Sequence, residues 1–179
     1  EVTTTGNIGY KTDTASVRIG VTGSVIIISN SGLSADSVVI NNKIYIRLTD
    51  SDENRLAAIE TIKVTVYTQL SNDSEIIELT ETTSTSGIFE GSVNTILGDS
   101  VYNNGTVEIF GTDVISIRYY DGIDAVGLLN QIREDTGKVQ EEGRLKIVDN
   151  LSGNNNELTS LLMSDSIYIQ IVDGDYDFS

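Results

Sequence analysis

Oxygen-bearing side chains stand at every second position after two apolar segments of this chain. The first set is Asp50, Asp52 and Asn54, and the second set is Asp173, Asp175 and Asp177. Calcium takes six to eight oxygen ligands at about 2.3–2.6 Å in a flexible geometry, so carboxylates, amides and backbone carbonyls suffice. Side chains at this spacing can share one face of a strand end, or wrap a cation where the chain leaves the strand. Each set therefore predicts part of a calcium site.

Three side chains are too few to complete such a site, so further oxygen ligands are needed. We expect them from Glu60, Asp121 and Asp124. An EF-hand is excluded, because counting Asp50 as the first position places Arg55 where that loop needs glycine. The same count places Thr61 where the EF-hand needs its bidentate glutamate.

Polar turn caps are the alternative interpretation of the same residues. Asp and Asn are common in turns because their side chains accept hydrogen bonds from nearby backbone N–H groups. Repetition of the pattern and the acidic excess favour the calcium interpretation over the turn caps.

The repetition extends beyond the acidic positions. Residues 43–54 reappear as 166–177 at a constant spacing of 123, and residues 23–30 resemble 143–150 at a spacing of 120. Internal repetition is a signature of repeat architectures. We therefore expect an N-terminal extension over 1–22 that is the tail of a preceding repeat, and one repeat over 23–142. The extension over 143–179 then holds the opening strands of a following repeat.

Composition excludes several classes of function. The chain has 27 acidic and 11 basic residues and a net charge of −16, which argues against nucleic acid or anionic lipid as a partner. No apolar run approaches the length needed for membrane insertion. The absence of His and Cys excludes the usual zinc, copper and iron sites and Ser-His or Cys-His catalysis. A carboxylate pair could act as in a glycosidase, but the acids lie in repeated positions, so we expect no enzyme.

The distribution of apolar residues predicts an all-β protein. Segments rich in Ile, Val, Tyr and Thr alternate with period two and are separated by Gly, Asn and Asp turns. We expect strands at 15–21, 24–29, 43–49, 61–69, 75–82, 88–95, 105–110, 113–120, 144–149 and 165–172. Strands at this spacing are typical of an antiparallel β-sandwich of the immunoglobulin-like or Greek-key type. The one helix candidate is 123–133.

An ordered set of motifs resembles the β-sandwich repeats of large bacterial and archaeal surface proteins. The motifs are Ile44–Asn54 with its Thr-Asp-x-Asp-x-Asn end, Ala58–Val66, Ile77–Thr82 with Leu-Thr-Glu-Thr, Ser86–Val93 with Gly-Ile-Phe-Glu-Gly, and Asp113–Asp121. The resemblance covers about 44–124. The chain departs from the pattern in lacking the usual prolines and in carrying long terminal extensions.

This resemblance implies an extracellular, secreted, calcium-associated structural module of a surface layer (S-layer) or an adhesin stalk. The competing implication is an adhesin or carbohydrate-binding module that contacts a surface ligand. The orphan strand 165–172 and its acidic set also lead us to expect copies of the chain as partners. An unpaired strand can be completed by another chain in a head-to-tail filament, or by the next repeat of a tandem array.

Overall fold

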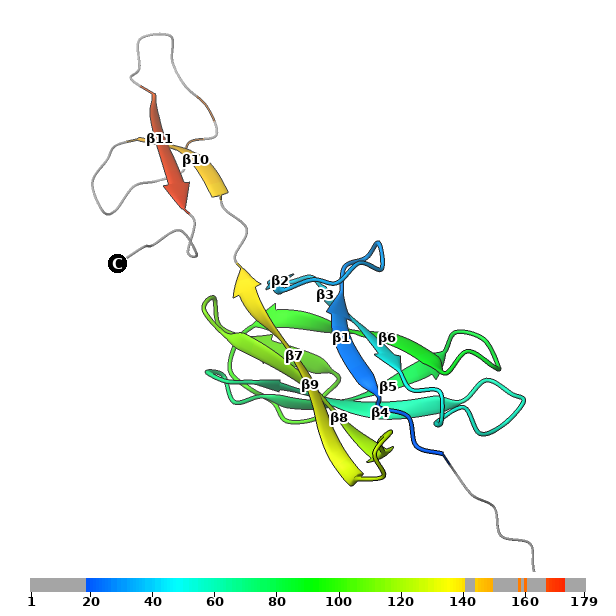
Figure 1. The fold of residues 1–179 in the computed structure, drawn as a ribbon. Coiled ribbons are helices and arrows are strands. Elements are labelled where there is room, and N and C mark those ends of the chain that lie inside the picture. Colours follow the sequence, from blue (N-terminus) through cyan, green and yellow to red (C-terminus); the bar gives the residue numbers. More distant parts are fainter. Residues whose placement is uncertain (1–18, 141–143, 150–157, 159, 161–166, 173–179) are drawn as a thin grey trace, which may run out of the picture.

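The computed structural model describes residues 19–140, 144–149, 158, 160 and 167–172. Within these residues the protein is all-β, with eleven strands and no helix (Figure 1). No described segment is a helix long and apolar enough to cross a membrane. The predicted acidic set Asp173, Asp175 and Asp177 lies outside the described residues, as does the greater part of the N-terminal extension.

The strands fall into two sheets. Those of the larger sheet are β1 (Ser24–Ile28), β2 (Ser37–Val39), β3 (Lys43–Thr49), β4 (Thr61–Thr68), β5 (Ser74–Glu81), β6 (Ile88–Leu97), β7 (Thr106–Ile109), β8 (Val114–Ile123) and β9 (Leu129–Gln140). The smaller sheet consists of β10 (Arg144–Val148) and β11 (Tyr168–Val172), which pair in antiparallel fashion.

The larger sheet has the strand order β1-β3-β6-β5-β4-β8-β9-β2, and β7 pairs with β6 beside this path. Most neighbours are antiparallel, as the spacing of the strands predicted. Two pairs are parallel, β2 with β9 and β6 with β7. The sheet is therefore mixed, and the prediction of a purely antiparallel architecture is wrong in this respect.

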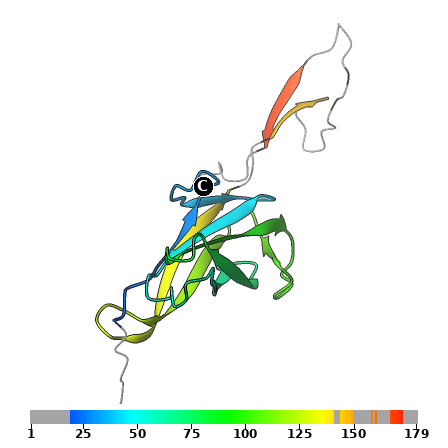
Figure 2. The same cartoon turned by 90° about the vertical axis from the view of Figure 1, so that its right-hand side faces the viewer.

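The larger sheet curls until its two ends meet (Figures 1 and 2). The backbone N–H of Ile27 in β1 donates a hydrogen bond to the carboxylate of Asp135 in β9, at 2.7 Å. A Cβ atom at Gly137 would lie 2.8 Å from Cδ1 of Ile27, so glycine permits the close passage of β9 over β1. Curling brings the inward faces of strands far apart in the sequence into one core.

Alternation along the strands fills this core. In β3, Ile44, Ile46 and Leu48 point inward and are at most 1% exposed, while the residues between them are not buried. Successive side chains of a strand point to opposite faces, so one apolar face packs inside and one polar face meets water. The same core takes its remaining buried members from the other strands of the larger sheet, including Val25, Ile27, Val64, Val66, Leu79, Phe89, Val93, Ile109, Ile115, Ile117 and Val139.

Nine of the ten predicted strands have a counterpart in the structure, with ends that differ by a few residues. For the tenth, at 15–21, the described part (residues 19–21) is not a strand. The helix predicted over 123–133 is wrong, because Leu129–Gln140 forms the long strand β9. The apolar residues on which the helix prediction rested, Val126, Leu129 and Ile132, have a helical spacing but are exposed. The short strand β2 was not predicted.

Candidate metal centre

The first acidic set lies in the loop that follows β3. The backbone N–H of Asp50 donates to the carbonyl of Gly87 at 2.8 Å, which ties the loop to the residue before β6. Gly87 has φ +60°, and a Cβ atom there would lie 2.7 Å from the Cα of Ser51. Glycine at 87 therefore lets the two segments approach closely and fixes where the loop begins.

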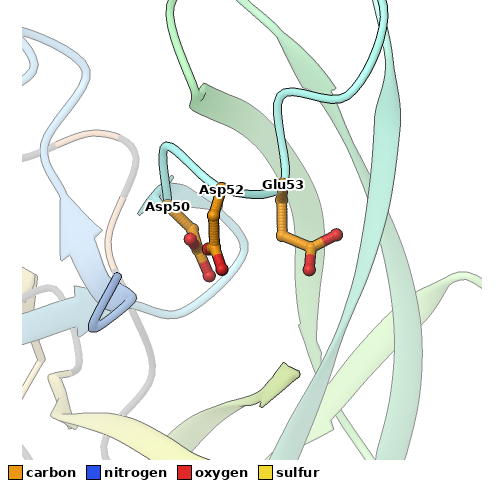
Figure 3. A group of neighbouring side chains, drawn as sticks. All are labelled: Asp50, Asp52 and Glu53. Atoms are coloured by element: carbon orange, nitrogen blue, oxygen red, sulfur yellow. The ribbon is translucent and has the colours of Figure 1, made fainter. Parts of the chain in front are cut away.

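Three carboxylates of this loop converge. One oxygen each from Asp50, Asp52 and Glu53 lie within 4.8 Å of one another. The carboxylates of Asp50 and Asp52 lie side by side, and Glu53 follows along the loop (Figure 3). Asp50 is fully buried, whereas the other two are half-buried. Like charges held this close repel unless a proton or a cation is shared among them.

Asp50 shows this repulsion in its electrostatics. Its pKa is raised to about 7, chiefly by burial and then by the side-chain contact with Asp52 and the charges of Asp52 and Asp121. The hydroxyl of Tyr119 donates to Oδ2 of Asp50 at 2.7 Å and opposes the rise only in part. The other oxygen, Oδ1, is buried and receives no hydrogen bond from the described residues.

Asp121 brings a further carboxylate from β8. Its side chain is 0% exposed, and its Oδ2 accepts hydrogen bonds from the backbone N–H of Gly23 at 3.0 Å and from Nε of Arg133 at 3.1 Å. Its Oδ1 is buried and, like that of Asp50, has no donor among the described residues. Asp121 is thus anchored by one oxygen, and its other oxygen is left for a partner.

Gly23 holds the two buried aspartates in one site. Its N–H bonds Asp121, and a Cβ atom on it would lie 2.8 Å from Oδ2 of Asp50 and 2.8 Å from the ring of Tyr119. The segment before β1 therefore passes directly over the site. Glu53 also reaches β8, because its Oε1 would lie 3.4 Å from a Cβ atom at Gly122.

Negative charge exceeds positive charge in this region. Arg133 forms ion pairs with Asp121 and Asp124, each at 3.1 Å, and Arg55 pairs with Glu53. These two guanidinium groups face five carboxylates, the ones named here together with Asp50 and Asp52. Buried charge of one sign is costly, so the arrangement favours an additional cation.

The residues predicted for the first site have different positions. Asp50 and Asp52 converge, with Asp121 beside them, and Asn54 lies half-buried in the same loop. Glu60 instead caps its own loop, accepting from the N–H groups of Arg55 at 2.6 Å and Leu56 at 3.0 Å.

Asp124 belongs to the edge of this region. Its Oδ1 accepts from the N–H groups of Val126 and Leu128, and its Oδ2 pairs with Arg133. The bonds from Leu128 and Val126 lower the pKa of Asp124, with help from Arg133. Asp124 therefore caps the turn before β9 and positions Arg133, and each of its two carboxylate oxygens already accepts a hydrogen bond.

Sequence reasoning missed four participants, namely Glu53, Tyr119, Arg133 and Gly23. Glu53 does not follow the every-second-residue spacing, because the loop turns after Asp52. Tyr119 could have been found, since it lies two residues before Asp121 and shares its face of β8. Arg133 pairs with Tyr119 across β8 and β9, and that pairing was hidden by the helix prediction.

A hard divalent cation fits the donor set. All the side-chain atoms that could bind the ion are oxygens. Two of these buried carboxylate oxygens, on Asp50 and Asp121, receive no hydrogen bond from the described residues. Mg²⁺ demands a near-ideal octahedron and retains waters, whereas Ca²⁺ tolerates irregular carboxylate clusters of this kind.

No protein-family model matches the chain, and no curated protein shows significant sequence similarity to it.

Proposed function

We propose that this chain is an extracellular structural module, a calcium-stabilised β-sandwich that builds a surface layer, stalk or fibre. The observation that carries the proposal is the pair of buried carboxylate oxygens without donors, Oδ1 of Asp50 and Oδ1 of Asp121. A buried carboxylate oxygen normally has a hydrogen-bond donor or a metal ion as its partner. In this proposal a calcium ion is the partner that these two oxygens lack.

The place of the site in the fold supports a structural role. It joins three segments that are distant in the sequence: the residues before β1, the loop after β3, and β8. A cation there links these segments, so the free energy of binding adds to the stability of the curled sheet. Extracellular calcium modules bind with Kd values of about 10⁻⁴–10⁻³ M, which suits a site assembled from a loop and a strand.

The burial of the site argues for an architectural rather than a catalytic use. Asp50 and Asp121 are at most 1% exposed, and Gly23 and Tyr119 cover them. A substrate would need access to the carboxylates, and these contacts obstruct it. Tyr119 donates its hydroxyl inward to Asp50, so it is not part of an exposed aromatic surface for a sugar.

Thermal unfolding in calcium and in EGTA tests the proposal. Calcium should raise the melting temperature in a saturable way, EGTA should reverse the rise, and equal magnesium should do much less. Asp52→Ala should lower the melting temperature in calcium, because it removes a calcium ligand. In EGTA it should change the melting temperature little, because it also removes one of the carboxylates that repel each other. The matched control is Asp99→Ala, an exposed acid outside the site that should change neither value. Equal losses for Asp52→Ala in both media would instead support the turn-cap interpretation.

A further inference from the structure

The smaller sheet repeats the opening pair of the larger one. In β1 and β3, Val25 lies opposite Leu48 and Ile27 opposite Ile46. In β10 and β11, Leu145 lies opposite Ile171 and Ile147 opposite Ile169. Adding 120 to each β1 residue and 123 to each β3 residue converts the first register into the second. A slip of one residue would turn every side chain to the other face, so equal registers are a specific likeness.

The two strand pairs also agree in how far the side chains on their outward faces are buried. Ile28 and its counterpart Val148 are both buried, and Tyr45 and its counterpart Tyr168 are both half-buried. Arg47 and Gln170 are likewise both half-buried. At these positions the outward faces of the two strand pairs are therefore covered to a similar degree.

The inward faces differ completely. Val25, Ile27, Ile46 and Leu48 are at most 4% exposed, whereas their counterparts Leu145, Ile147, Ile169 and Ile171 are 36–72% exposed. Four large aliphatic side chains thus form a continuous apolar face on a two-stranded sheet. Such a pair is at best marginally stable alone, and a contiguous exposed apolar face marks a surface that binds protein.

We propose that β10 and β11 are the first two strands of a second module, and that their apolar face is covered by a second copy of the strands β4 to β9. The larger sheet shows this contact in the same chain: β3 pairs with β6 from Lys43↔Asn94 to Thr49↔Ile88, and the inward face of β1 and β3 packs in the common core. The register and apolar pattern of β10 and β11 fit the same neighbours. The inference specifies the partner in the proposed architectural role, but it stands on this register and not on the calcium site.

An extended chain tests the inference. The spacing of 123 makes Ser179 the counterpart of Leu56. The test protein is therefore the full chain with a second copy of residues 57–140 joined directly after Ser179. Hydrogen exchange is then measured by mass spectrometry in the chain with and without the extension. We expect the amides of β10 and β11 to exchange at least tenfold more slowly in the extended chain, approaching the rates of β1 and β3. Those two strands serve as the internal reference in both proteins.

Two variants of the extended chain show which face makes the contact. Ile169→Asp places a charge on the apolar face and should abolish the new protection while β1 and β3 stay protected. Gln170→Arg alters the outward face and introduces the residue that stands at the equivalent position 47, so protection should persist. Unchanged exchange of β10 and β11 after extension would overturn the proposal. So would strong protection in the unextended chain together with a dimer in light scattering, because copies of the whole chain would then cover the face.

A disulfide gives a second, independent readout. The chain has no cysteine, so a pair introduced by Gln170→Cys and by Glu90→Cys in the second copy reports on these positions alone. The pair corresponds to Arg47 and Glu90, which lie directly opposite each other in β3 and β6. Mild oxidation should crosslink this pair and not a pair shifted to the second copy's Ser92. Equal crosslinking of the two pairs, or none of the matched pair, would refute the register that the proposal requires.

Discussion

Two buried aspartates near opposite ends of β8 have opposite electrostatic surroundings. Asp113, just before the strand, accepts hydrogen bonds from the N–H groups of Gln69, Leu70 and Ser71 at 2.9–3.1 Å and from the hydroxyl of Ser71 at 2.7 Å. Burial alone would raise its pKa, but the bonds from Leu70 and Ser71 outweigh burial and lower it. Asp50, at the other end, has one hydroxyl donor and a raised pKa.

The difference separates the two interpretations of an aspartate near a strand end. Both side chains are 1% exposed, so burial does not distinguish them; the supply of donors does. Asp113 is a turn cap that the protein satisfies from its own backbone. Asp50 lacks that supply and faces other carboxylates, which is the environment that our proposal requires of a cation ligand.

Removing the satisfied aspartate should have the largest effect. Asp113→Ala removes this acceptor from the buried N–H and hydroxyl groups of Ser71 and from the part-buried N–H of Leu70, and a buried donor left unsatisfied costs about 1–3 kcal/mol. We expect a loss of about 3 kcal/mol in the free energy of unfolding, equal in calcium and in EGTA. Urea denaturation in both media measures it, with Asp99→Ala as the control. A loss that depends on calcium would contradict the assignment of Asp113 as a cap.

Neutralising the unsatisfied aspartate should act only through the cation. At calcium concentrations of 100 Kd, a native-state site adds about 2.7 kcal/mol to stability. Asp50→Asn should lose most of this in calcium, while in EGTA it should be as stable as the parent or more so, because a repelling charge is gone. The same urea experiment gives both values. Destabilisation in EGTA of the same size as in calcium would place Asp50 with Asp113 as a cap.

A methyl group at Gly23 should disturb the site without changing any charge. The Cβ atom would lie 2.8 Å from Oδ2 of Asp50 and from the ring of Tyr119, so these groups must shift. Overpacking of this kind costs about 1–3 kcal/mol, and we expect about 2 kcal/mol in calcium together with weaker calcium binding in calorimetry. Gly98→Ala is the matched control, because a Cβ atom there has nothing within 4 Å. Unaltered calcium affinity in Gly23→Ala would remove the N-terminal segment from the site.

Alternation revealed much of the fold because it reports the inward face of each strand directly. It located β3 and β4, where buried Ile and Val alternate with polar residues. It failed for β9, most of which is not buried, so its few apolar residues carried no period-two signal and Val126, Leu129 and Ile132 imitated a helix. The parallel pairs join β2 to β9 and β7 to β6, and local pattern does not encode which strands become neighbours.

The convergence of acidic side chains at the candidate site was predictable to the extent that these side chains lie in one loop. The spacing of Asp50 and Asp52 indicated a cation, and two carboxylates of the first set do converge. Glu60 lies ten residues after Asp50 in the sequence and was a reasonable candidate, yet its carboxylate caps the backbone of its own loop. Arg133 enters through the pairing of β8 with β9, which only the tertiary structure reveals.

The smallest effect we expect is a change of stability with pH that differs between the two aspartates. The pKa of Asp50 rises from 3.8 to about 7 on folding, so the metal-free folded state binds its proton more tightly than the unfolded state does. This contribution to stability is complete below about pH 4 and is lost as the pH rises through 7. The lowered pKa of Asp113 works in the opposite sense, since its contribution is present above pH 3.8 and is lost as the pH falls.

Comparison with Asp50→Asn isolates the first contribution. In EGTA, the parent should lose about 1 kcal/mol relative to this variant between pH 6 and pH 8, because the variant has no proton to release at that position. In calcium the difference should reverse, since the cation replaces the proton and binds more tightly as the pH rises. Urea denaturation at the two pH values measures both quantities. Parallel pH profiles for parent and variant in EGTA would show that Asp50 is charged throughout this range. Its buried negative charge would then have to be compensated by something other than a shared proton or a cation.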